Sequence, residues 1–155
     1  IPQAYLGIAF GFGIPMAYAA HLGSVPAEAW WLLLANVFWA VAYDTEYAMV
    51  DRNDDLKIGV KSAAILFGDA DRAILASMQA MVLVALWLVG RQAVLGRWFT
   101  GALVVGAALF VWQQWLIRNR EREACFRAFL NNHWFGLVIF AGIALDYLFT
   151  RPATP

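Results

Sequence analysis

Five apolar segments, each near the length that crosses a bilayer, constrain the fold of this chain most strongly. A helix of about 20 apolar residues spans the ~30 Å hydrocarbon core of a membrane. The chain is 63% hydrophobic and only 14% charged, with a mean hydropathy of +0.63, whereas a soluble domain is about 25% charged. We therefore expect an all-α, polytopic transmembrane helical bundle that forms a single membrane domain over residues 1–155. Its five spans lie roughly at 2–21, 28–50, 73–90, 98–117 and 133–149.

The basic residues predict how these spans are oriented. With five alternating spans, residues 51–72 and 118–132 lie on one side of the membrane and carry eight of the eleven Lys and Arg. The positive-inside rule then places that side in the cytoplasm. A formal net charge of zero provides no overall basic field for nucleic acid. The single cysteine, Cys125, has no partner in the chain for a disulfide.

A strongly polar stretch follows the second apolar segment. Residues 43–62 hold five acids and two lysines, and carboxylates in or beside a bilayer are costly, which favours a working site. If the helix continues through this stretch, each residue advances by about 100°. One face then carries a polar stripe, which we expect to face a bundle interior or a cavity, while Glu46 points away. The stripe consists of Asn36, Tyr43, Asp44, Tyr47, Asp51 and Asp55.

The spacing within the stripe suits a metal-bound diphosphate. Asp51 and Asp55 are spaced i, i+4, so their carboxylates can share one cation. Mg²⁺ prefers a few carboxylates together with phosphate oxygens and water, and it neutralises the charge that develops as a diphosphate departs. Lys57 and Lys61 can add positive charge to the same leaving group. The sequence therefore predicts a membrane enzyme that handles a metal-bound diphosphate.

Several motifs follow one another in order along the chain. The first is Tyr43-Asp44-x-x-Tyr47-x-x-x-Asp51-x-x-x-Asp55, followed by Lys57-Ile58-Gly59-Val60-Lys61-Ser62 and Leu66-Phe67-Gly68. The later ones are Arg118-x-Arg120-Glu121-Arg122-Glu123-Ala124-Cys125-Phe126 and Phe129-Leu130-Asn131-Asn132-His133. Together they resemble the UbiA-type intramembrane aromatic prenyltransferases, most closely the members that act on 4-hydroxybenzoate. The first motif is similar to the second aspartate motif of that family.

The resemblance implies nine transmembrane helices, of which this chain corresponds to the last five. It also implies Mg²⁺-assisted ionisation of a polyprenyl diphosphate and attack by the ring of 4-hydroxybenzoate, in ubiquinone biosynthesis at the bacterial inner membrane. The implied site faces the cytoplasm. Its expected residues are Asp51 and Asp55 for Mg²⁺, Lys57 and Lys61 for the diphosphate, and Asp44, Tyr43 and Tyr47 in catalysis, where they orient the acceptor or stabilise the cation by a ring face.

One part of the family pattern is missing from this sequence. The first aspartate motif, of the type Asn-Asp-x-x-Asp, has no counterpart here. We therefore expect a missing N-terminal half that carries it, and we expect this chain alone to be inactive. The alternatives are a membrane cation transporter that uses Asp44 and Asp51, a non-catalytic membrane subunit, or a sibling prenyltransferase with another acceptor. A transporter predicts acids near the bilayer midplane and has no need for the lysines.

Other polar residues have simpler interpretations. Asn131, Asn132 and His133 precede or begin the fifth apolar segment, where they either line the cavity or cap the helix. Asp146 is expected to be an interfacial or packed acid. The charged run 118–127 is typical of a solvated amphipathic loop near lipid headgroups.

Overall fold

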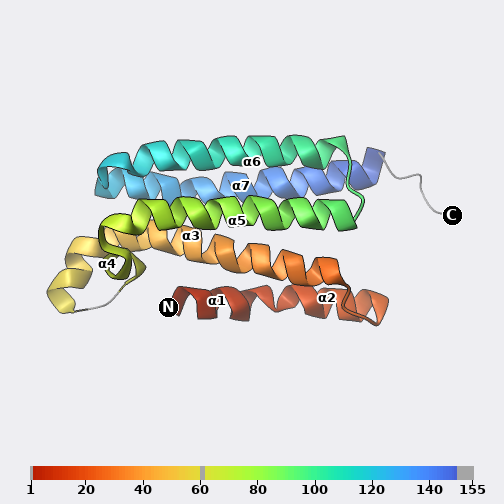
Figure 1. Ribbon diagram of the computed structural model, residues 1–155, viewed down its shortest axis with the longest axis horizontal. Helices are drawn as coiled ribbons and strands as arrows, with labels where there is room; N and C mark the ends of the chain where they lie inside the picture. The colour runs from red at the N-terminus through yellow and green to blue at the C-terminus, as the bar shows by residue number, and fades with distance from the viewer. Residues whose placement is uncertain (1, 60–61, 150–155) are drawn as a thin grey trace.

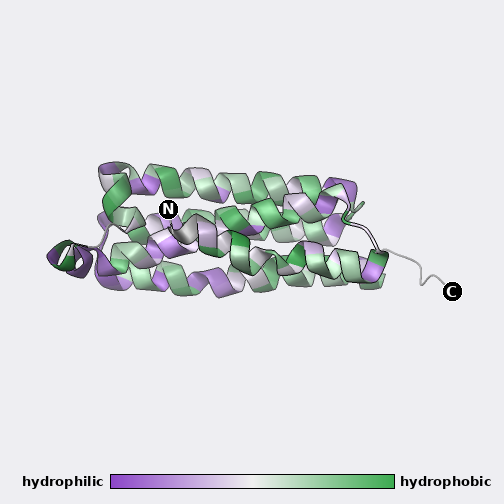
Figure 2. Cartoon of the chain, turned by 90° about the horizontal axis from the view of Figure 1, so that it is seen from below, coloured by the Kyte–Doolittle hydropathy of each residue, from purple (hydrophilic) through white to green (hydrophobic). Residues whose placement is uncertain are grey.

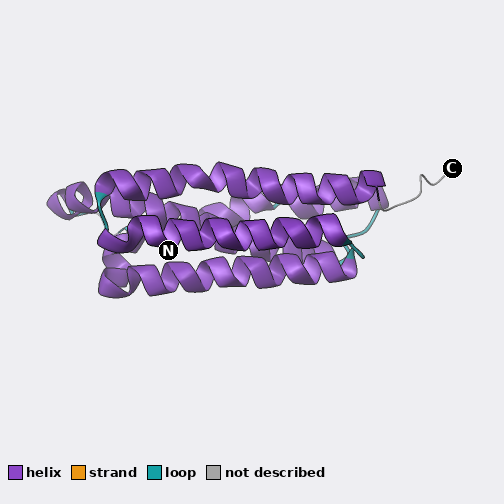
Figure 3. Ribbon diagram, turned by 90° about the horizontal axis from the view of Figure 1, so that it is seen from above, coloured by secondary structure: helices purple, strands orange, loops and turns teal. Residues whose placement is uncertain are grey.

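A computed structural model describes residues 2–59 and 62–149, and this part of the chain is helical with no strand. The long helices lie side by side and run alternately up and down (Figures 1 and 3). The expected all-α bundle is therefore confirmed. The helices are α1 (Pro2–Gly11), α2 (Gly13–Leu22), α3 (Ala27–Ile58), α4 (Ala63–Phe67), α5 (Asp71–Gln92), α6 (Arg97–Leu116) and α7 (Arg122–Phe149), with 3₁₀ turns at Gly68–Ala70 and Ile117–Asn119.

Within the described residues, four stretches of helix are long and apolar enough to cross a membrane. They are Tyr5–Leu22, Ala63–Gln92, Arg97–Asn119 and Arg122–Phe149. The expected second span, in α3, is long enough at 32 residues but less apolar, because Asn36, Asp44 and Glu46 interrupt its apolar run. In the bundle α3 is the central helix, packed against α1, α5 and α7, so its neighbours cover much of its polar surface.

The first span is broken into two helices. α1 ends at Gly11 and α2 begins at Gly13, with Phe12 between them. Pro15 lies in the first turn of α2, where its missing N–H costs little. Phe12 itself has helical dihedral angles, and its N–H donates to the carbonyl oxygen of Ile8 at 3.0 Å, so helical hydrogen bonding continues from α1 into α2.

Small residues allow the helices to approach one another closely. A Cβ atom at Gly7 would lie 2.9 Å from the Cβ of Ala40 in α3. One at Gly142 in α7 would overlap the Cβ of Ala102 and lie 3.2 Å from the carbonyl oxygen of Trp98, both in α6. Since there is no room for even a methyl group at these crossings, the spacing of α1 from α3, and of α6 from α7, depends on glycine.

Buried amide side chains join the other three long helices. Gln79 in α5 donates to Gln113 in α6 at 2.8 Å and accepts from Gln114 at 2.9 Å. Gln113 also donates to Asn131 in α7 at 3.2 Å. A buried amide without partners is costly, so these contacts fix the rotation of α5, α6 and α7 about their own axes.

Asp146 stabilises the end of the bundle at which α6 begins, opposite to the end that carries α4. Its Oδ2 accepts hydrogen bonds from the backbone N–H groups of Gly96 at 2.9 Å and Phe99 at 2.8 Å. These are among the N–H groups that the first turn of a helix leaves without intrahelical partners. Asp146 therefore caps α6 from α7, and its expected role as a packed acid is confirmed.

The end of the bundle that carries α4 is strongly hydrophilic (Figure 2). The last turns of α3 project beyond the other helices at this end (Figure 1). The expected loop at 118–132 is wrong, because the 3₁₀ turn Ile117–Asn119 is short and α7 begins at Arg122. The charged residues from Arg122 onward therefore lie on a helix with a fixed direction rather than on a solvated loop.

Candidate functional site

The acidic motif lies on one uninterrupted helix, as the sequence predicts. α3 continues through the motif to Ile58, and Gly59, with a φ of 76°, ends it. Asp51 and Asp55 are half-buried near this end, one helical turn apart. Lys61 lies outside the residues that the structure describes. Because the last turns of α3 project beyond the other helices, the carboxylates of Asp51 and Asp55 lie at the hydrophilic end of the bundle rather than near the middle of the bundle.

Aromatic rings pack against the tyrosines in the middle of the polar stripe. The ring of Phe129 in α7 lies 6.3 Å from that of Tyr43 and 5.1 Å from that of Tyr47, between centroids. Trp39, one turn earlier in α3, meets Tyr43 edge to face at 5.9 Å. Tyr47 is still 44% exposed, so its ring is held on one side and open on the other.

Basic side chains surround the acids of the motif. Arg122, in the first turn of α7, lies 3.7 Å from the Asp51 carboxylate and 3.2 Å from that of Asp54. Lys57 also pairs with Asp54 at 3.2 Å. The hydrogen bond and charge of Lys57, followed by the charge of Arg122, lower the pKa of the Asp54 carboxyl below its ordinary value. These pairs are exposed and contribute little stability, so the side chains are free to rearrange around a ligand.

A groove between α3 and the start of α7 exposes part of the stripe. Tyr47, Asp51, Arg122 and Phe126 are among the residues that line it, while Asp44 is half-buried further along α3. The stripe therefore faces a cavity in part, as expected, and is not enclosed by the described helices. Glu46 is fully buried and bonded to Asn132 of α7, the helix whose Phe129 packs on Tyr43 and Tyr47. The expectation that Glu46 points away from the stripe is therefore wrong with respect to its tyrosines.

The donor set fits part of a magnesium site. Asp51 and Asp55 offer carboxylate oxygens, which Mg²⁺ prefers, and Asp51 already attracts the guanidinium of Arg122. In the described part of the chain, no group of three or more His, Cys, Asp or Glu side chains is placed to hold a metal ion. Two carboxylates suit Mg²⁺ when phosphate, water or other residues complete its shell.

A buried ion pair anchors the acidic end of α3. Asp71 in α5 is 0% exposed, and Arg120 donates to its two oxygens at 2.6 and 2.9 Å. The backbone N–H of Arg72 adds a bond of 2.6 Å. Arg52, the residue after Asp51, lies 3.7 Å from the same carboxylate. The pair therefore ties α3, α5 and the turn before α7 together beside the motif.

Sequence reasoning missed a buried polar chain that joins α3 to α7. The Nδ2 of Asn132 donates to the Oε2 of Glu46 at 2.6 Å, and the Nε1 of Trp39 donates to the Oδ1 of Asn132 at 2.9 Å. Asn132 lies well inside α7, so the alternative of helix capping is wrong for it. The sequence did contain one signal for this polar chain. Glu46 is an acid within an apolar run, and such an acid is costly unless it is paired.

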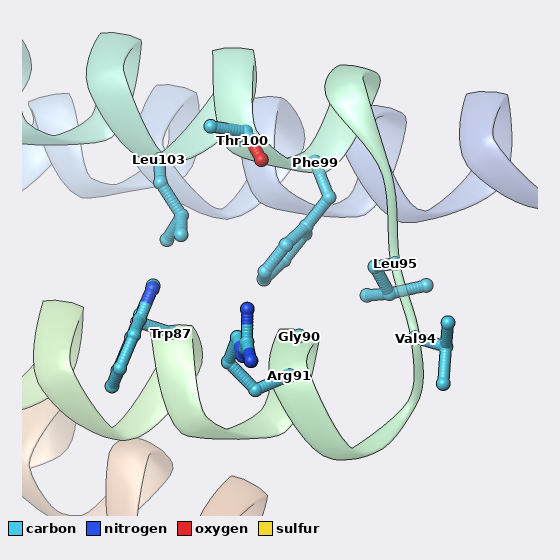
Figure 4. Close-up of a pocket in the computed structure, with 8 residues that line it drawn as sticks. All are labelled: Trp87, Gly90, Arg91, Val94, Leu95, Phe99, Thr100 and Leu103. Atoms are coloured by element: carbon cyan, nitrogen blue, oxygen red, sulfur yellow. The ribbon is translucent and has the colours of Figure 1, made fainter.

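The cavities among the apolar parts of the described helices include the following two. One, of about 230 Å³, lies between α2, α3, α5 and α7; its apolar lining includes Leu32, Trp39, Leu86, Phe135 and Ile139. The other lies at the opposite end from the motif, between α5 and α6, with the ring of Phe99 over Gly90 (Figure 4). Arg91 is the only ionisable residue in the lining of that second cavity. The first cavity adjoins the polar stripe, because Asn36 of the stripe lies in its lining together with Trp39.

Comparison with known proteins gives a consistent match. The model of the UbiA prenyltransferase family matches residues 1–143. The 4-hydroxybenzoate octaprenyltransferase of Ectopseudomonas mendocina is 61% identical over 94% of this chain and 49% of its own length. Those of Dechloromonas aromatica and Hahella chejuensis are 60% and 57% identical, over 96% and 98% of this chain. The chain thus spans about half the length of these relatives. No solved structure matches it.

Proposed function

Because the chain belongs to the UbiA prenyltransferase family, we propose that the whole protein transfers a polyprenyl group from its diphosphate to the ring of 4-hydroxybenzoate. The names of the similar proteins support this acceptor. The observation that carries the proposal is the position of Asp51 and Asp55 at the hydrophilic end of α3, with an apolar cavity further along the same helix. A charged diphosphate and a hydrocarbon tail need these two environments.

In this proposal each polar residue has one task. Asp51 and Asp55 hold Mg²⁺, which supplies positive charge to the leaving diphosphate when it is bound. Lys57 and Lys61 bind the diphosphate oxygens. Three further residues, Tyr43, Asp44 and Tyr47, orient the acceptor or stabilise the electron-poor prenyl carbon through the face of a ring.

The setting follows from the distribution of charge. We assign the hydrophilic end to the cytoplasmic side of the bacterial inner membrane, where the positive-inside rule puts the basic residues. The part of the relatives' length that this chain does not cover would supply the first aspartate motif and complete the metal site. A membrane cation transporter that uses Asp44 and Asp51 has less support, because Asp51 lies at the hydrophilic end of α3, where Arg122 pairs with it.

The proposal is tested by identifying the product that the whole protein forms. Membranes containing it are incubated with octaprenyl diphosphate, Mg²⁺ and 4-hydroxybenzoate, and the product is analysed by mass spectrometry. We expect 4-hydroxybenzoate prenylated ortho to its hydroxyl, and no product after chelation of the metal. Parallel reactions offer the acceptors of sibling enzymes that make haem O, menaquinone or chlorophyll precursors. Prenylation of one of these instead would contradict the proposed acceptor.

A further inference from the structure

Two arginines at the hydrophilic end of the bundle have no acidic partner among the described residues. Arg72 lies in the first turn of α5, and Arg118 lies in the 3₁₀ turn Ile117–Asn119 after α6. The described acids of this region pair with other basic residues, namely Arg52, Lys57, Arg120 and Arg122. A charge beside a bilayer is costly unless it is paired. These two charges therefore call for a negative partner from outside the described helices.

Both guanidinium groups are held at the C-terminal end of α6. The Nη1 of Arg72 donates to the carbonyl oxygen of Arg118 at 3.3 Å, and the Nη1 of Arg118 donates to that of Trp115 at 2.7 Å. A guanidinium carries five N–H donors, so capping these carbonyls leaves most of them unused. The Nε of Arg72 is buried and has no hydrogen-bond partner in the described part of the chain. Helix capping alone therefore does not account for the pair.

Arg118 lies at the end of an exposed apolar stripe on α6. Its guanidinium lies over the ring of Trp115, 3.9 Å from the centroid, and Trp112 stacks on Trp115 at 4.8 Å between centroids. Steps of about 100° per residue place Val104, Val111, Trp115 and Arg118 within about 60° of one another. The apolar members of this stripe, Val104, Val111 and Trp115, are all exposed.

In a membrane this stripe faces lipid. The stretch Arg97–Asn119 is long and apolar enough to cross a bilayer. α6 packs against α5 and α7 and lies on the far side of the bundle from α1 (Figure 1). Trp rings near the end of a membrane helix lie at the level of the lipid headgroups. The guanidinium over Trp115 therefore lies at the level of the lipid phosphates.

We infer that Arg72 and Arg118 bind the phosphate of an anionic phospholipid whose acyl chains lie along the apolar stripe of α6. Guanidinium groups bind phosphate oxygens through paired N–H donors, and basic sites between transmembrane helices suit anionic headgroups. A zwitterionic lipid brings its own positive group and so compensates the two arginines less well. The acids that follow, Glu121 and Glu123, line the groove toward α3. This site is independent of the reaction proposed above.

The test measures which lipid the whole protein retains. The protein is purified in detergent and mixed with equal amounts of phosphatidylglycerol and phosphatidylcholine that carry the same acyl chains. The bound lipids are then counted by native mass spectrometry, and the readout is the ratio of bound phosphatidylglycerol to bound phosphatidylcholine. We expect Arg72→Gln and Arg118→Gln each to lower this ratio about fivefold. Arg127→Gln removes the same charge from an exposed position of α7 and should leave the ratio close to that of the wild type.

Three results of this experiment would overturn the inference. The first is a wild-type ratio near one, which would show that the protein does not select the anionic lipid. The second is an equal loss in all three variants, which would mean that overall charge attracts the lipid without a defined site. The third is release of phosphatidylglycerol by inorganic phosphate, because the site would then take free phosphate and not a lipid.

A second measurement leaves both arginines in place and decides the question if their variants do not accumulate. The whole protein is placed in bilayers that contain brominated phosphatidylglycerol or brominated phosphatidylcholine at the same mole fraction. The fluorescence of Trp115 is obtained as the difference between the wild type and Trp115→Phe, which keeps a ring under Arg118. We expect the brominated phosphatidylglycerol to quench it more strongly. Equal quenching by the two lipids would contradict the site. Quenching by neither would show that protein, such as a second copy of the chain, covers the stripe, and would also contradict it.

Discussion

Replacing Arg120 with Met should destabilise the protein more than replacing its partner Asp71 with Asn. The reason is the unequal burial of the two side chains. Asp71 is 0% exposed, whereas the Arg120 side chain is 32% exposed. After Arg120→Met the carboxylate of Asp71 stays buried without its main partner. After Asp71→Asn the guanidinium of Arg120 can turn toward water.

The contacts set the size of each effect. Breaking a buried ion pair by removing one partner costs about 3–5 kcal/mol. The N–H of Arg72 and the side chain of Arg52 still face Asp71 in the variant, so we expect the lower end, about 3 kcal/mol. In Asp71→Asn an acceptor oxygen remains, and the loss of a charge-assisted hydrogen bond costs about 1.5 kcal/mol.

The assay is equilibrium unfolding of the whole protein in detergent micelles, followed by circular dichroism. Adding Asp71→Asn to Arg120→Met removes the buried charge, so the double variant should be more stable than Arg120→Met alone. The reasoning is refuted if Arg120→Met is no more destabilising than Asp71→Asn. It is also refuted if the second substitution lowers stability further.

Two more predictions concern the packing of α6 against α7 and the binding of the diphosphate. Gly142→Ala introduces a methyl group against the Cβ of Ala102 and should lower the free energy of unfolding by about 2 kcal/mol. Gly101→Ala, which meets no neighbour within 4 Å, should leave it unchanged or raise it by up to about 1 kcal/mol. Lys57→Glu should raise the KM for the prenyl diphosphate severalfold and leave the KM for 4-hydroxybenzoate unchanged. A change confined to the aromatic acid would show that Lys57 has been assigned to the wrong substrate.

Helical periodicity predicted the arrangement of the motif because α3 is continuous. Once residues 27–58 form one helix, the common face of Asp44, Asp51 and Asp55 follows from geometry alone. This feature depends on a short stretch of sequence.

The features that the sequence did not predict depend on partners far along the chain. Glu46 and Asn132 are 86 residues apart, and Asp71 and Arg120 are 49 apart. Periodicity places each residue on a face of its own helix but does not say which helix that face meets. The start of α7 at Arg122 was missed for another reason, since its charged first turns resemble a loop in composition although they are helical.

The account depends most on the assignment of Asp51 to the metal, and one comparison tests it directly. In the whole protein, Mg²⁺-dependent transfer of the prenyl group to 4-hydroxybenzoate is measured for Asp51→Asn and for Asp54→Asn. Both substitutions remove one carboxylate from the same stretch of α3, but Asp54 is exposed and pairs with Lys57 and Arg122. We predict that Asp51→Asn abolishes transfer and that Asp54→Asn retains most of it. Near wild-type transfer by Asp51→Asn, or an equal loss in both variants, would contradict the assignment.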